Sequence, residues 1–404
     1  MSGPVARDPR AAARRLLPVI VLLLVSGALV IGRGEGRPSP RDDAVFLQAA
    51  YLLRTEDVST IEAVTRAAEN QFGWGGELSQ RLRSEGDIQT YALVPVWSRI
   101  GGFQTGESPW GRPLYVESDR ISRLSQLAFV AAVFLLYWAA LPLGRGVALA
   151  AAVLLALGHP FRHGPALFDP WVMPGVAAAI GWWLRDRHVP AAVAAAAVVM
   201  IKPNYLFLLP AFFLASLVRP ATGDPRGRRG LAPAAVHAVA AGVVVGTYLV
   251  LNTLDVIWVD GYAEGVRSGY DPAVLAYSLL ETLGFTYRAG TQQLRDSWPL
   301  FPWTALNGAA LAVLGHRALG HRRLTRTTAL VGGLVLIPVL ANFAVIGSVD
   351  AYEDGGHFRW INVSIMGMAL ALPLAYREVA RLVAARADAR SSADTRPAVE
   401  AGVR

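Results

Sequence analysis

The stretch Val198-Val-Met-Ile-Lys-Pro-Asn-Tyr-Leu-Phe207 interrupts an apolar run with a charge and a proline. Lys202 is the only lysine of the chain, whose 38 basic residues are otherwise arginines. Proline disfavours helix at the residue before it, so the run is predicted to break at Lys202. A charge in an apolar setting usually faces a polar cavity or a partner, and a compact ammonium differs chemically from a forked guanidinium. The stretch therefore predicts a functional cation where two short helices meet; the alternative is a snorkelling or salt-bridged structural lysine.

The apolar run that this stretch divides, residues 189–218, has arginines on both flanks. Basic segments between apolar runs are typical of the cytoplasmic loops of membrane proteins. Both ends of the run are therefore predicted to be cytoplasmic, which makes it a short hairpin with Lys202 at its tip. Neither half comfortably spans a hydrocarbon core of ~30 Å, and non-helical backbone at that depth needs protein or water around it. We expect Lys202 to face a cavity that opens outward.

Composition places the whole chain among multi-span membrane proteins. Of its 404 residues, 53% are hydrophobic and 17% are charged, with a mean hydropathy of +0.38. The chain has no cysteine, which excludes disulfides, thiolate metal sites and cysteine nucleophiles. The net charge is +8, but the arginines cluster between apolar runs. That placement indicates membrane topology and no nucleic-acid partner.

The hydropathy pattern predicts an all-α polytopic membrane protein of about ten transmembrane or re-entrant helices. The membrane domain is expected over residues 16–376, with long extracytoplasmic loops at about 33–122 and 252–299. Residues 1–15 and the partly disordered tail 377–404 are expected in the cytoplasm. The predicted apolar spans, with the hairpin among them, are 16–32, 124–143, 147–158, 172–184, 189–218, 231–251, 300–315, 327–347 and 360–376.

An acidic pair, Asp42-Asp43, opens the first outer loop. Either aspartate is a suitable N-cap for a helix that begins near Ala44. The functional alternative is a general base at the outer membrane surface. Adjacent residues on a helix do not share a face, so the pair does not form the two-carboxylate couple of most glycosidases. One aspartate would act as base while the other caps or orients.

Other polar residues are predicted at the same outer surface. His357 and Arg359 precede the last span, where they fit a phosphate contact, a polar wall for a sugar, or simple interfacial anchoring. Further cavity-lining candidates are Arg162, His163, Asp169 and Asn204. The histidines lack metal-ligand spacing, and no metal or other cofactor is predicted.

Three stretches resemble the GT-C superfamily of integral membrane glycosyltransferases, most closely its bacterial polyprenyl-phosphate-mannose-dependent branch. The first, Asp42-Asp43-Ala-Val-Phe-Leu-Gln-Ala-Ala-Tyr-Leu-Leu, resembles the acidic motif of the first outer loop. The second is Met200-Ile-Lys-Pro-Asn-Tyr-Leu-Phe-Leu-Leu-Pro210, which is similar to the Lys-Pro hairpin. The third, Gly356-His-Phe-Arg-Trp-Ile, is similar to the arginine-containing start of a late span.

The resemblance implies a GT-C-like fold in the cell membrane, with both termini cytoplasmic and the active site outside. It implies inverting transfer of mannose or a pentose from a polyprenyl-phosphate donor to a hydroxyl of a glycolipid or glycan acceptor. The lipid-linked sugar is then a substrate, and the protein binds it as a lipid of the membrane. Asp42 or Asp43 is implied as base, and Lys202 with Arg359 and His357 as the donor-phosphate site.

Two other classes of protein stay open. A transporter or lipid flippase predicts polar residues in both halves of the membrane, whereas the candidate residues here fall on the outer side. A non-catalytic cell-envelope assembly protein could keep the same scaffold without activity.

Overall fold

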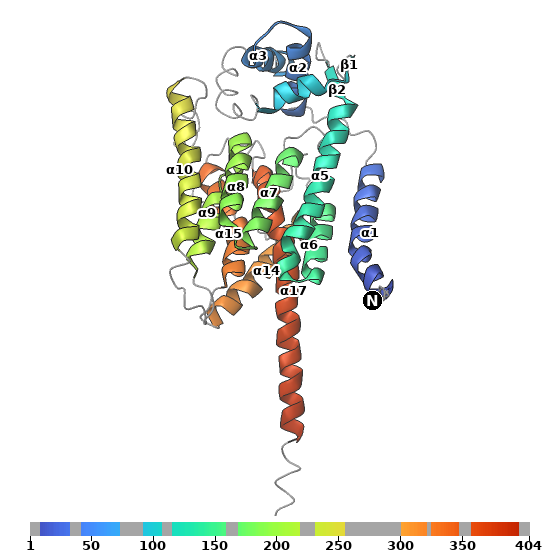
Figure 1. The fold of residues 1–404 in the computed structure, drawn as a ribbon, viewed down its shortest axis with the longest axis vertical. Coiled ribbons are helices and arrows are strands. Elements are labelled where there is room, and N and C mark those ends of the chain that lie inside the picture. Colours follow the sequence, from blue (N-terminus) through green and yellow to red (C-terminus); the bar gives the residue numbers. More distant parts are fainter. Residues whose placement is uncertain are drawn as a thin grey trace, which may run out of the picture.

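The computed structural model describes residues 9–32, 42–72, 92–106, 115–158, 169–218, 231–254, 300–320, 325–346 and 357–395. Most of these residues are helical, and the helices form an elongated bundle with a smaller unit at one end (Figure 1). Arg162, His163 and the second long loop lie outside the described residues, apart from the loop's first three positions.

The bundle follows the apolar runs of the sequence closely. Each predicted span coincides with a helix, and the run 189–218 divides into two. The helices are α1 (Pro9–Gly32), α5 (Asp119–Ala140), α6 (Arg145–Gly158), α7 (Asp169–Trp183), α8 (His188–Ile201), α9 (Leu208–Leu217), α10 (Leu231–Thr253), α14 (Leu300–Gly320), α15 (Arg326–Ile346) and α17 (His357–Thr395). Short 3₁₀ turns are η1 (Leu141–Leu143) and η3 (Pro203–Tyr205).

The smaller unit, called the head here, comprises α2 (Asp42–Thr55), α3 (Thr60–Phe72), the helical residues 92–100 and a hairpin of β1 (Phe103–Gly106) and β2 (Tyr115–Ser118). The antiparallel hairpin pairs Phe103 with Ser118, a short two-stranded sheet that the sequence did not predict in a chain whose described residues are otherwise mostly helical, as expected. Gly101 and Gly102, with φ of 63° and 76°, turn the backbone out of the preceding helix. Ser118 then caps α5 by accepting a hydrogen bond from the Ile121 amide.

The head has its own apolar core, separate from that of the bundle. Residues 45–50 of α2 are buried on all sides of the helix, and they share this core with Leu52 and the fully buried Trp97. Arg54, at the end of α2, donates to the Ser98 carbonyl at 3.0 Å. These contacts fix α2 on the helical residues 92–100.

The bundle core is built largely from alanine, valine and leucine. Because small residues let helices approach closely, α7 crosses α5 at Gly181, where an added Cβ would lie 2.2 Å from the Trp138 ring. On the outside, α1 and α10 expose leucine and valine, including Leu24, Val239 and Val243. In the described part of the chain, two helices are long and apolar enough to cross a membrane, Asp119–Leu143 and Leu231–Leu251.

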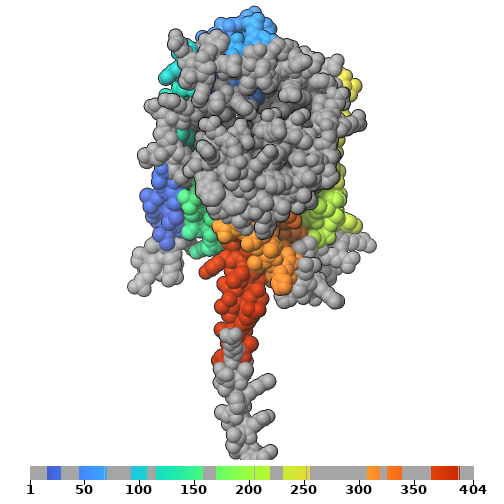
Figure 2. Space-filling model, turned by 180° about the vertical axis from the view of Figure 1, so that it is seen from behind, coloured from blue at the N-terminus to red at the C-terminus, as the bar shows by residue number. Residues whose placement is uncertain are grey.

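The last helix, α17, is longer than its predicted span. It continues without a break through Tyr376 to Thr395, and its later half stands clear of the bundle (Figures 1 and 2). Residues 379–389 are exposed, with Arg381 and Arg386 among them. The end of the bundle from which α17 projects is called the tail end here, and the opposite end the head end.

Candidate functional site

The backbone breaks at Lys202, as the sequence predicts. Lys202 is the C-cap of α8 with extended backbone (φ −136°, ψ 98°), and Pro203 begins η3 directly after it. The Lys202 amide donates to the Val198 carbonyl at 2.8 Å, and the Lys202 carbonyl accepts from the Tyr205 amide at 3.0 Å. Backbone contacts on both sides therefore hold the lysine, whose side chain is half-buried.

This break lies at the head end of the bundle. Ile201, the residue before Lys202, packs against the apolar core of the head. Trp171, in the first turn of α7, packs on the same core, and its indole donates to Ser125 at 2.7 Å. The end of α8 and the start of α7 are thus both attached to the head.

The start of α17 points toward the same end. Its Arg377 donates to the Leu143 carbonyl at 2.6 Å, which fixes that part of α17 where α5 ends, at the tail end. His357 lies 20 residues earlier, about 30 Å along a helix that rises 1.5 Å per residue. α17 also contacts η3, next to Lys202. His357 and Arg359 therefore begin the helix on the head side.

The acidic pair occupies the first turn of α2. The helix begins at Asp42, two residues before the predicted start at Ala44. Carboxylates in a first turn are stabilised by the free amides and the positive end of the helix dipole. Val45, just after the pair, is buried in the head, which anchors this turn. The pair thus sits on the unit that Ile201 contacts.

The predicted site residues that the structure describes therefore lie at the ends of helices or directly beside them. Asp42 and Asp43 begin α2, Asp169 begins α7, Lys202 ends α8, and Asn204 lies in η3. Their segments, with the start of α17, all lie at or beside the head end. Of these residues the structure describes the side chain of Lys202, and the others are located by their backbone.

Basic residues at the tail end take part in contacts between helices. Arg185, in the turn after α7, stacks 4.0 Å from the Trp138 ring centroid and donates to the carbonyls of Ala139 and Gly181. Burial, and then the nearby charge of Arg187, lower the pKa of the Arg185 guanidinium. This arginine, which the sequence predicts to be cytoplasmic, also joins α7 to α5.

A second tail-end cluster joins α7, α8, α10 and α15. Arg326 donates to Asp186 at 3.1 Å and lies 5.4 Å from the Trp183 ring centroid. His188 meets His237 edge to face at 5.8 Å between ring centroids, and His237 is fully buried. The histidines therefore serve helix packing, and among the described residues no cluster of three metal-ligating side chains forms.

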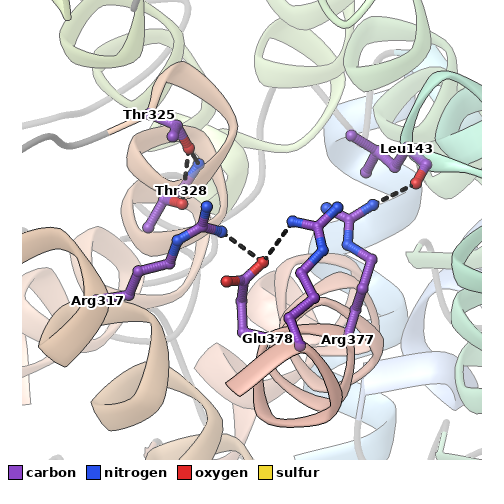
Figure 3. A network of polar contacts seen from close by, with 7 residues as sticks. Leu143, Arg317, Thr325, Thr328, Arg377 and Glu378 are labelled. Atoms are coloured by element: carbon purple, nitrogen blue, oxygen red, sulfur yellow. Dashed lines mark hydrogen bonds and ion pairs between the residues drawn. The ribbon is translucent and has the colours of Figure 1, made fainter. Parts of the chain in front are cut away.

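The third tail-end cluster centres on Glu378, which is 6% exposed (Figure 3). Its carboxylate pairs with Arg317 of α14 and, at 3.0 Å, with Arg381 one turn further along α17. Next to it, Arg377 reaches across to the end of α5 (Figure 3). Sequence reasoning missed this carboxylate because a single glutamate in a charged tail gives no burial signal.

No protein-family model matches the chain, and no curated protein matches it.

Proposed function

We propose that this protein is a polytopic membrane glycosyltransferase of the GT-C type, with its active site at the head end. The donor is a polyprenyl-phosphate sugar, and the acceptor is a hydroxyl of a glycolipid or glycan. One observation carries the proposal: the lone lysine, the acidic start of α2 and the start of α17 are far apart in sequence but belong to segments at one end of the bundle.

The membrane setting is supported by the two span-length helices and by the exposed apolar residues of α1 and α10. In water such surfaces would promote aggregation, whereas lipid tails cover them without cost. The arginines at the tail end agree with a cytoplasmic face under the positive-inside rule. The head end is then extracytoplasmic, where lipid-linked sugars of the outer leaflet are reached.

The chemistry follows from the residue types. The Lys202 ammonium binds the donor phosphate, with Arg359 and His357 as further contacts, and stabilises the charge that develops as the bond breaks. Asp42 or Asp43 takes the proton of the acceptor hydroxyl. The acceptor oxygen bonds to the anomeric carbon from the opposite face, and the bond from that carbon to the phosphate oxygen breaks. Polyprenyl phosphate leaves with the electron pair, so it needs no proton from the enzyme.

A transporter or flippase needs a polar path between the two ends. The buried residues of α8, which runs from the tail-end cluster to Lys202, are all apolar: Ala191, Ala192, Ala195, Val198 and Val199. The polar clusters at the tail end include ion pairs and carbonyl contacts between helices, among them Arg326 with Asp186 and Arg377 with Leu143. In the described part of the bundle this interior favours an enzyme that works at one face.

The direct test is sugar transfer by the purified protein. Membranes or nanodiscs that contain the protein would be supplied with radiolabelled polyprenyl-phosphate sugars and a panel of glycan acceptors. Lys202→Ala should lower kcat/KM about 10- to 100-fold, the range expected for a lost hydrogen bond to a charged group. Arg386→Ala, on the exposed part of α17, is the matched control and should leave kcat/KM unchanged. Transfer from none of the donors, or normal transfer by Lys202→Ala, would refute the proposal.

A further inference from the structure

The break at Lys202 leaves a carbonyl in α8 without its usual helical partner. In an uninterrupted helix the Val199 carbonyl accepts from the amide of residue 203, four positions later. Residue 203 is proline and has no amide hydrogen. Carbonyls in the last turn of a helix are stabilised by other donors when they are not solvated.

A side chain from another helix supplies such a donor. The phenol hydroxyl of Tyr248, on α10, donates to the Val199 carbonyl at 3.3 Å. The neighbouring Val198 carbonyl is satisfied by the Lys202 amide itself. The Tyr248 contact thus lies in the turn that the Lys202–Val198 backbone bond closes.

We propose that Tyr248 is a positioning residue for Lys202: by capping the Val199 carbonyl it holds the last turn of α8 and fixes the point from which the ammonium projects. The role of the ammonium as phosphate ligand rests on the function proposed above. The position of the turn does not rest on that function, because the position follows from the hydrogen bond between Tyr248 and Val199 and from the proline at residue 203.

The bond is long for a hydroxyl donor, since such bonds usually measure about 2.5–3.0 Å. Its contribution is therefore expected at the lower end of the range for hydrogen bonds. We expect the opening equilibrium of the turn to change about two- to fivefold when the hydroxyl is lost.

Hydrogen–deuterium exchange of the purified protein in nanodiscs tests the contact without reference to activity. Tyr248→Phe removes the hydroxyl and keeps the ring. It should speed exchange of the Ile201 and Lys202 amides about two- to fivefold, while amides of α5 and α7 exchange as before. The matched control is Tyr376→Phe, because Tyr376 is 77% exposed on α17 and makes no such contact in the described structure.

A second variant separates capping from general packing. Pro203→Ala restores an amide at residue 203 and lets α8 continue, so the Val199 carbonyl gains a backbone donor. In that background Tyr248→Phe should have no effect on exchange. Unchanged exchange in Tyr248→Phe, or an equal effect with and without the proline, would overturn the proposed role of Tyr248.

Donor kinetics then distinguish this role from the function itself. If both hold, Tyr248→Phe lowers kcat/KM for the polyprenyl-phosphate donor in the parent protein, but has no further effect in Lys202→Ala. An exchange effect without any change in donor kcat/KM would leave the turn as described and refute the positioning role of Tyr248, while loss of transfer in Lys202→Ala tests the phosphate role separately. A kcat/KM change that persists in Lys202→Ala would refute action through the lysine.

Discussion

The two ends of the bundle use their charged residues differently. At the tail end, Arg185, Arg326 and Glu378 each bind groups on a neighbouring helix, so their charges hold the bundle together. At the head end, the lone lysine sits at a helix break that costs α8 a backbone hydrogen bond. A purely structural cation would not require this break. We therefore expect loss of these tail-end charges to affect stability, and loss of Lys202 to affect the proposed transfer.

The largest effect is expected at the acidic pair. Asp42→Asn and Asp43→Asn keep the shape of the residue, and the one that removes the base should lower transfer about 100- to 10,000-fold, the usual contribution of a general base. Thermal unfolding should change little, because asparagine is also a good residue at a helix start. Transfer assays and unfolding curves of both variants would check this. Wild-type transfer by both would end the functional role of the α2 start.

An intermediate effect on stability is expected at Glu378. Glu378→Ala removes the buried carboxylate that pairs with Arg317 and Arg381, which should lower the free energy of unfolding by about 2 kcal/mol. Both arginines are partly exposed and can turn to solvent, so the effect is smaller than for a fully buried pair.

Asp388→Asn, on the exposed part of the same helix, is the control and should change the free energy of unfolding by less than about 0.5 kcal/mol. Denaturant unfolding in detergent gives both values. An equal effect of the two substitutions would show that the part of α17 packed on the bundle contributes no more to stability than the part that projects from it.

The smallest effect is expected at the crossing of α5 and α7. An added Cβ at Gly181 meets the Trp138 ring, on which Arg185 stacks, whereas one at Gly242 meets nothing within 4 Å. Gly181→Ala should therefore lower the free energy of unfolding by about 1 kcal/mol. Gly242→Ala should leave it unchanged or raise it slightly, since alanine favours helix. If the two variants behave alike, close approach at this joint is not what stabilises the tail end.

Local sequence signals predicted the helices well, because each apolar run is long and its ends are marked by arginine, glycine or proline. Pro203 placed the break in residues 189–218 correctly, since its effect is local. The hairpin of β1 and β2 was missed because its strands have four residues each and no alternating pattern strong enough to detect. The contact between Tyr248 and Val199 joins positions 49 apart. No local pattern predicts such a pairing.

The candidate site was likewise predictable only where a local pattern marks its residues. Asp42-Asp43 and Lys202 were predicted from residue type and order, and their segments lie at or beside one end of the bundle. The roles of Arg359, His357, Asp169 and Asn204 stay predictions, as do those of Arg162 and His163. Glu378 could not be predicted, because its burial depends on α14, some 60 residues away.

The central claim is that Lys202 binds a lipid-linked phosphate, and a single-residue signal can test it. Because Lys202 is the only lysine, reductive methylation with ¹³C-formaldehyde labels one side chain and the N-terminal amine. The Lys202→Ala variant, which keeps only the N-terminal signal, distinguishes the two. We predict that polyprenyl phosphate shifts the Lys202 signal to saturation, while polyprenol without phosphate does not. No shift with polyprenyl phosphate, or the same shift with polyprenol, would contradict the account.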